Sequence, residues 1–117
     1  MTFRAACIQL CSSTDVEENI AAVDRLAREA KAQGADYVQT PEMTNIVQRS
    51  RRQLAGAIHS EEDDPSVQAF SALAAELGIV LHIGSLALDA GDGKIANRAY
   101  IFGPDGDVQL RYDKIHL

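Results

Sequence analysis

Two charged side chains near predicted strand ends are the residues of this sequence best suited to chemistry. Glu42 follows Pro41 at the end of segment 35–40, and Lys114 lies in a similar context near the other end of the sequence. A carboxylate that a nearby ammonium group keeps ionised can act as a general base. On spacing alone, a structural ion pair is the better interpretation, because any α/β domain has some Glu and Lys near its strand ends.

The elements that would position Glu42 follow from apolar periodicity and turn residues. Residues 3–10 are apolar with little alternation, which predicts a strand buried on both faces. A capping-box pattern over 14–17 begins an amphipathic helix, and Gly34 ends it. Residues 35–40 then form a second strand with Glu42 just past its carboxyl end, where ligands bind in α/β sheets.

The remainder of the chain predicts one long helix and three further strands. The expected elements are a helix over 65–77, capped by Asp64 and ended by Gly78, a strand over 79–88, a turn over 89–93, and strands over 96–102 and 107–112 joined by a turn at 103–106. Residues 44–64 have a weaker pattern that fits a short helix. We therefore expect an α/β fold with a mostly parallel, mixed sheet, an antiparallel final hairpin and helices packed on one or more faces.

Composition limits the classes of function. The 117 residues suffice for one domain, and 46% apolar with 24% charged residues is typical of a soluble globular protein. The chain lacks an apolar run of ~20 residues and a secretion-signal pattern, so we expect no membrane partner and a cytoplasmic location. The net charge of -6 argues against a nucleic-acid partner. Arg49, Arg51 and Arg52 are expected to lie in a solvated loop or helix start.

The two cysteines predict neither a disulfide nor a metal site. Cys7 and Cys11 lie four residues apart, and on one strand this separates them by roughly 13 Å, too far for a disulfide. We interpret Cys7 as a small buried apolar residue. Cys11, at the strand end, could approach a site, but a structural role is favoured.

Histidines and acidic residues also lack metal-site spacing, and no motif indicates a cofactor. His82 lies within an apolar strand and is expected to be a hydrogen-bonded core or face residue. His59 is expected to be exposed. The acidic run 61–64 is expected to be a solvated lead-in to the following helix rather than a metal site.

Four motifs, in order along the whole chain, carry a family resemblance. They are Ala6-Cys7-Ile8-Gln9-Leu10, Thr40-Pro41-Glu42, the segment Asn97 to Gly106, and Tyr112-Asp113-Lys114-Ile115-His116-Leu117. In this combination the sequence resembles the nitrilase superfamily of carbon–nitrogen hydrolases. It is most similar to the amidase branch related to ω-amidase, in which the Lys-Ile-His-Leu motif is familiar.

The resemblance implies an α-β-β-α sandwich and a Glu-Lys-Cys catalytic site that hydrolyses a small amide to an acid and ammonia. It implies that Glu42 is the general base and that Lys114 stabilises the tetrahedral intermediate. The chemistry is consistent with these roles, because a thiol needs a base to become a thiolate and an oxyanion needs a fixed donor or cation. In the family the nucleophilic cysteine follows the Lys motif, so neither Cys7 nor Cys11 takes that role.

We therefore expect residues 1–117 to be the N-terminal portion of a single carbon–nitrogen hydrolase domain, inactive by itself. The alternative is a catalytically inactive fragment or paralogue that acts as an assembly or binding module. A half-sandwich would leave one sheet face uncovered, including parts of 79–88 and 96–102, so we expect self-association of the isolated chain. The family resemblance also implies a homo-oligomer, and a position near Lys114 for His116.

Overall fold

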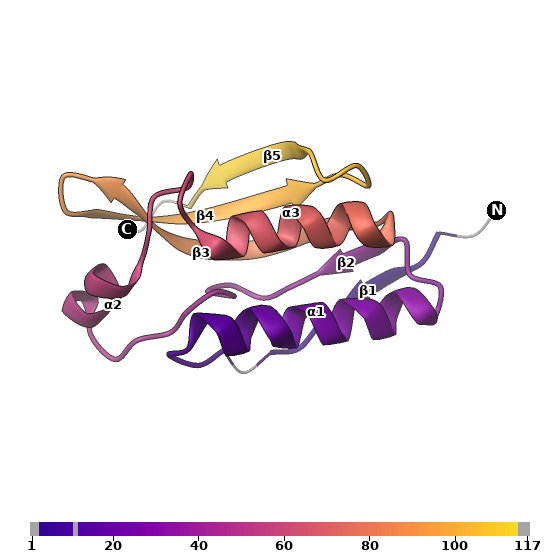
Figure 1. The fold of residues 1–117 in the computed structure, drawn as a ribbon, viewed down its shortest axis with the longest axis horizontal. Helices are drawn as coiled ribbons and strands as arrows, with labels where there is room; N and C mark the ends of the chain where they lie inside the picture. The colour runs from indigo at the N-terminus through magenta and orange to yellow at the C-terminus, as the bar shows by residue number, and fades with distance from the viewer. Residues whose placement is uncertain (1–2, 11, 115–117) are drawn as a thin grey trace.

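A computed structural model describes residues 3–10 and 12–114, and this part of the chain contains five strands and three helices. In chain order the elements are β1 (Ala5–Cys7), α1 (Val16–Ala32), β2 (Tyr37–Gln39), α2 (Arg51–Ala57), α3 (Pro65–Leu77), β3 (Val80–Gly91), β4 (Lys94–Phe102) and β5 (Val108–Asp113). Figure 1 shows them as one layered unit. Within the described ranges, no helix is both long and apolar enough to cross a membrane.

The five strands form one mixed sheet in the order β1-β2-β3-β4-β5. The pairs β1–β2 and β2–β3 are parallel, and the pairs β3–β4 and β4–β5 are antiparallel. The parallel half follows from the helices α1 and α3, which return the chain to the same end of the sheet. The predicted α/β fold with a mixed sheet is therefore confirmed.

Both long helices begin and end where local chemistry favours it. In α3, Asp64 accepts a hydrogen bond from the Val67 amide at 3.0 Å, Pro65 occupies the first turn, and Gly78 closes the helix with φ +63°. These caps are as predicted. In α1 the predicted cap is wrong by one residue, because the Asp15 carboxylate, and not a hydroxyl at the preceding position, accepts from the Glu18 amide at 3.2 Å.

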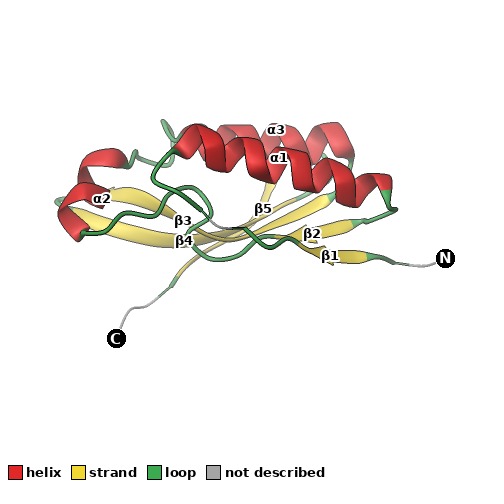
Figure 2. Ribbon diagram, turned by 90° about the horizontal axis from the view of Figure 1, so that it is seen from below, coloured by secondary structure: helices red, strands yellow, loops and turns green. Residues whose placement is uncertain are grey.

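Helices α1 and α3 pack side by side on the same face of the sheet, and the hydrophobic core lies between them and that face (Figure 2). The buried core side chains include Val23, Ala27, Val38, Phe70, Leu73, Leu81, Ile83, Tyr100 and Phe102. The opposite face carries no helix in the described ranges, and we call it the open face. This agrees with the expectation that one side of the sheet is uncovered.

The first strand differs most from its prediction. Pairing is limited to Ala5–Cys7, and both of these end residues are exposed. The strand is at the edge of the sheet, and only alternate side chains such as Ile8 point towards the helices, so burial on both faces is wrong. The prediction that Cys7 is buried is wrong for the same reason, because its thiol belongs to the open face.

The β3–β4 hairpin is longer than its pattern predicted. Pairing continues through Asp89↔Ile95 to Gly91↔Lys94. The turn therefore consists of Asp92 and Gly93 and is shorter than the predicted 89–93. Asp92 has φ 54°, in the left-handed region that Asp tolerates in tight turns.

Candidate active site

Glu42 and Lys114 lie 72 residues apart in sequence and form an ion pair. The Lys114 Nζ donates to Glu42 Oε1 at 2.5 Å, with the lysine side chain 29% exposed and the glutamate side chain 67% exposed. The structure therefore brings the two predicted site residues together at the surface. The glutamate side chain is mostly exposed and accessible from solvent.

Glu42 lies in a tight turn of residues 40–44, which we call the Glu42 corner. Main-chain groups of this corner bond to strand β3: the Thr40 amide donates to the His82 carbonyl at 2.9 Å, and the Thr44 amide donates to the Ser85 carbonyl at 2.9 Å. The Met43 amide donates to Ser85 Oγ at 2.8 Å. Met43 has φ 52°, an uncommon conformation that these bonds hold in place.

A glycine in β3 allows this close approach. A Cβ built on Gly84 would lie 2.5 Å from the Thr40 carbonyl oxygen and 2.6 Å from the Pro41 carbonyl carbon. Gly84 also sits where the β3–β4 register shifts between Ile83 and Leu86, which marks an irregularity in the strand. This role of Gly84 was not predicted from the sequence, although a glycine inside an apolar strand pattern is the signal for a bulge or a close backbone contact.

A buried asparagine anchors the far side of the Glu42 corner. The Asn45 amide donates to the Ala87 carbonyl and accepts from the Ala87 amide, both at 2.9 Å, so the side chain pairs with β3 as another strand would. Asn19 of α1 in turn donates to the Asn45 carbonyl at 2.8 Å. Asn45 is 1% exposed, and its bonds connect the corner to the helix layer. No sequence motif singled out either asparagine.

Lys114 is held at the end of the edge strand β5. Its amide donates to the Asn97 carbonyl of β4 at 2.9 Å, which continues the strand pairing by one residue. Because side chains alternate along a strand, Leu110, Tyr112 and Lys114 share one face. Asp113 points to the opposite face, where Arg98 of β4 binds it.

A groove of about 430 Å³ runs along the open face beside the ion pair. Its lining includes Glu42, His82, Gly84, Leu110, Tyr112 and Lys114. Charged and apolar side chains thus face one shallow space, which is large enough for a small organic molecule. Cys7 does not line this groove.

His82 lines the groove and is hydrogen-bonded. Its Nδ1 lies 2.5 Å from the Tyr37 hydroxyl. Burial and then the positive charge of Lys114 lower the pKa of His82, and burial raises the pKa of Tyr37. The prediction of a hydrogen-bonded face residue is confirmed, and the predicted exposure of His59 is also observed.

Within residues 3–10 and 12–114, no group of three His, Cys, Asp or Glu side chains lies close enough together to hold a metal ion. In the acidic run, Asp64 caps α3, and Glu61 bonds to Tyr100 and Arg111. Cys11 and His116 lie outside the described residues.

Comparison with known proteins gives a consistent set of relatives. The model of the carbon–nitrogen hydrolase family matches residues 4–117. The chain is 37% identical over 118 residues to an omega-amidase of Mus musculus, covering 99% of this chain and 41% of the relative. It is 32% identical over 115 residues to a hydrolase of Schizosaccharomyces pombe, covering 98% of this chain and 35% of the relative. The chain thus spans about two fifths of the length of these curated relatives.

Solved structures show the same fold. An amidase from Nesterenkonia superposes with a TM-score of 0.84 at 26% identity, covering 98% of this chain and 43% of that chain. The NitFhit protein of C. elegans superposes with a TM-score of 0.83 at 24% identity, covering 100% of this chain and 29% of that chain, and supports the fold alone.

Proposed function

This chain belongs to the carbon–nitrogen hydrolase family, and we propose that it supplies the general base and the lysine of a thiol amidase site. The observation that carries the proposal is the 2.5 Å contact between Lys114 Nζ and Glu42 Oε1 beside the groove. An ammonium group at this distance keeps the carboxylate ionised and so able to take a proton. We further propose that the whole protein acts in the cytoplasm.

In the proposed mechanism Glu42 removes the proton of a cysteine thiol, and the thiolate attacks the amide carbon. The oxyanion of the tetrahedral intermediate then forms beside the Lys114 ammonium, which stabilises the developing charge. The carbon–nitrogen bond breaks as the leaving nitrogen takes the proton from Glu42, and ammonia departs. Glu42 next activates a water, which attacks the thioester and releases the acid and the thiol.

The proposal assigns the thiol to neither cysteine of this sequence. Cys7 lies on the open face of the edge strand and does not line the groove. Among the relatives, an amidase from Nesterenkonia is described with acrylamide added at its active-site cysteine. By the family pattern, the corresponding cysteine follows the Lys-Ile-His-Leu motif, and residues 1–117 alone are expected to be inactive.

We propose a small amide as the substrate. Several relatives are omega-amidases, which supports an amide at the end of a short acid as the first compound to assay. The groove beside Glu42 and Lys114 has room for a molecule of this size. The proposed reaction uses only side-chain groups, so it requires no cofactor.

The test is ammonia release by the protein expressed over its whole reading frame, across a set of small dicarboxylic monoamides and simple amides. We expect activity in the unsubstituted protein and a loss of about 10²- to 10⁴-fold in Glu42→Gln. The matched control is Glu17→Gln, on the exposed first turn of α1, which should keep full activity. Equal activity in the two variants would contradict the role of Glu42.

A second candidate is an assembly module without catalysis, and the open face favours it. Phe3, Leu110 and Tyr112 are 70%, 52% and 57% exposed, and the last two line the groove on that face. Exposed apolar surface of this kind promotes association. Sedimentation of the isolated chain should show dimers or larger species. A monomer at all concentrations would contradict this candidate, and amidase activity of the whole protein would favour the first.

A further inference from the structure

The edge strand β5 carries Lys114, yet burial does little to fix its register. Within β5 only Val108 is partly buried, and the other residues to Asp113 are exposed. The pairing of β4 with β5 already contains one register shift, between Ile101 and Phe102. Beyond Val108 and the turn, where the Gly103 amide donates to the Asp107 carbonyl at 2.8 Å, apolar packing does not select one register of β5 over its neighbours.

Register decides which face Lys114 occupies. Side chains alternate along a strand, so a slip of one residue transfers every side chain to the other face. Lys114 would then point to the helix side, away from Glu42 and the groove. The ion pair between Lys114 and Glu42 lies partly in solvent, and exposed pairs of this kind contribute only about 0 to 1 kcal/mol, too little to hold the strand.

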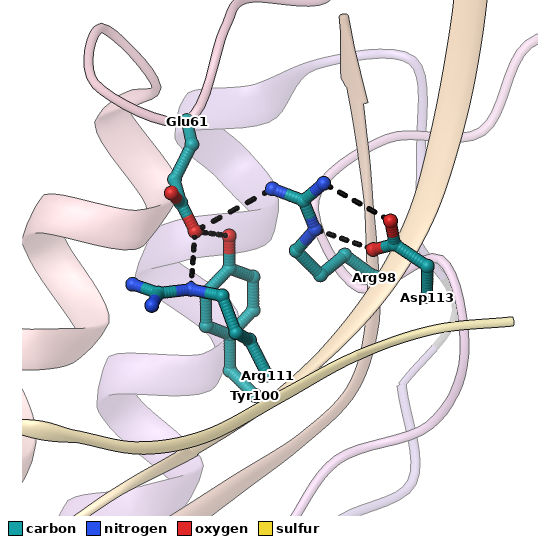
Figure 3. Close-up of polar contacts among 5 residues, drawn as sticks. All are labelled: Glu61, Arg98, Tyr100, Arg111 and Asp113. Carbon is teal, nitrogen blue, oxygen red and sulfur yellow. Dashed lines mark hydrogen bonds and ion pairs between the residues drawn. The ribbon is translucent and has the colours of Figure 1, made fainter. Parts of the chain in front are cut away.

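An arginine on the other face binds the residue just before Lys114. Arg98 of β4 lies opposite Asp113 of β5 in the strand register. Its Nε donates to Asp113 Oδ1 at 2.5 Å and its Nη2 to Oδ2 at 3.1 Å, as Figure 3 shows. Two parallel bonds fix both position and orientation, which a single ammonium could not do. The Arg98 side chain is 21% exposed and the Asp113 side chain 56%, so the advantage of this pair over the Lys114–Glu42 pair lies in its two parallel bonds and in the further contact of Arg98 with Glu61.

Glu61 connects Arg98 to the core. In Figure 3 one Glu61 oxygen faces three donors: the Tyr100 hydroxyl at 2.5 Å, Arg111 Nε at 2.9 Å and Arg98 Nη1 at 3.6 Å. The Tyr100 ring is fully buried and stacks on Phe102 with 5.4 Å between ring centroids. The loop before α3 and the strands β4 and β5 therefore meet at this carboxylate.

We infer that Arg98, supported by Glu61, is a positioning residue that locks the register of β5 and so places Lys114 against Glu42 on the opposite face. The lock works because Asp113 and Lys114 are adjacent and face opposite ways: holding the first on the helix side fixes the second on the groove side. This inference rests on the proposed function only for its effect on catalysis, since the register itself can be measured without substrate.

The test uses the protein expressed over its whole reading frame and compares Arg98→Ala with the unsubstituted protein. Hydrogen exchange at the Lys114 amide, which donates to Asn97, should become at least about tenfold faster, while amides of the core strand β3 stay protected. Ammonia release should lose at least about tenfold in kcat, with KM changed less, because Lys114 acts on the intermediate. Asp113→Ala should reproduce both effects, and the double variant should add little to either single change.

Arg28→Ala is the matched control. Arg28 Nε donates to Asp24 Oδ1 at 2.7 Å, and the same guanidinium pairs with Glu76, but these residues lie on α1 and α3 away from β5. The control should leave exchange at Lys114 and kcat unchanged. An Arg98→Ala variant with a protected Lys114 amide and the kcat of the control would overturn the inference. If the unsubstituted protein hydrolyses no amide, the proposed function fails, and the exchange measurement still decides the register.

Discussion

The two halves of the candidate site are held by different forces. The Glu42 corner is fixed by buried, mostly uncharged hydrogen bonds from Thr44, Asn45 and Ser85, each at most 1% exposed. Lys114 is fixed by its strand pairing and by ion pairs at the partly exposed edge of the sheet. Buried polar groups that lose a partner cost about 1–3 kcal/mol each, whereas exposed ion pairs are worth about 0–1 kcal/mol.

This difference indicates which changes should displace Glu42 and which should displace Lys114. Changes of packing should displace Glu42 and destabilise the fold together, because the corner is part of the core layer. Changes of charge, acidity or salt should loosen Lys114 with a smaller loss of overall stability. The site thus combines a carboxylate carried by a firmly held backbone turn with an ammonium group carried by a less firmly held edge strand.

The largest effect is expected for Gly84→Val. Its Cβ would lie 2.5 Å from the Thr40 carbonyl oxygen, so the corner or strand β3 must shift. We expect a loss of about 1–3 kcal/mol in the free energy of unfolding, measured by urea denaturation, together with loss of amidase activity. Gly56→Ala in α2 is the control, since nothing lies within 4 Å of its Cβ, and it should be neutral or stabilising. Equal stability of the two variants would show that the close approach is not required.

A somewhat smaller loss is expected for Asn45→Ala. The change leaves the buried amide and carbonyl of Ala87 without their side-chain partner. We expect about 1–2 kcal/mol of destabilisation, and less if water reaches the gap. The urea midpoint should fall while the Lys114 amide keeps its protection against exchange. A variant that loses protection at Lys114 before the global transition would contradict the separation of the two halves.

Acid should act first on the Lys114 half. Hydrogen bonds from Tyr100 and Arg111 lower the pKa of Glu61, and Arg98 lowers the pKa of Asp113. A carboxylate with a lowered pKa in the folded state adds stability above its unfolded value, about 4.3 for Glu, and that contribution is lost as pH falls through the folded pKa. Glu61→Gln should therefore flatten the decline in urea midpoint between about pH 5 and pH 3.

The control for this acid effect is Glu17→Gln, which removes an exposed carboxylate of α1. Its urea midpoint should fall with pH as steeply as that of the unsubstituted protein. Raising the salt concentration should weaken the same ion pairs by screening, and so speed exchange at Lys114 without changing that of β3. If the urea midpoint falls equally steeply with pH in Glu61→Gln and Glu17→Gln, Glu61 does not contribute to the loss of stability in acid.

The smallest effect concerns His82, which lies in the groove between the two halves. Burial and Lys114 lower its pKa, so the folded state disfavours its protonation. Stability should therefore decrease slightly as pH falls below the unfolded value of about 6.5, and His82→Gln should remove this decrease. A titration of the imidazole by NMR should give a midpoint below 6.5, and a midpoint above that value would be contrary to the prediction.

Sequence patterns predicted the parts of the fold that depend on local chemistry. Asp64, Pro65 and Gly78 bound α3 as expected, because caps and breakers act within a few residues. The exposure of Cys7 could not be predicted, since an apolar run does not tell whether a strand lies inside a sheet or at its edge. The role of Gly84 depends on a segment more than forty residues away, and only the three-dimensional structure brings them together.

The site was predicted in part. The motifs singled out Glu42 and Lys114, and the structure brings them into contact. Arg98 and Asp113 occur in the same motifs, but their pairing follows from the β4–β5 register, which a sequence with an exposed edge strand does not define. Charges that act across strands are therefore the component that sequence alone describes least well.

A double-mutant cycle on amide hydrolysis by the whole protein tests the central claim, that Glu42 and Lys114 serve one site. The variants are Glu42→Gln, Lys114→Met and their combination, each compared by kcat/KM with the unsubstituted protein. We expect each single change to cost at least about 10²-fold, and the double variant to lose little more than the worse single one, because the two groups act on the same intermediate. Losses that multiply, or a single variant with full activity, would contradict a shared site.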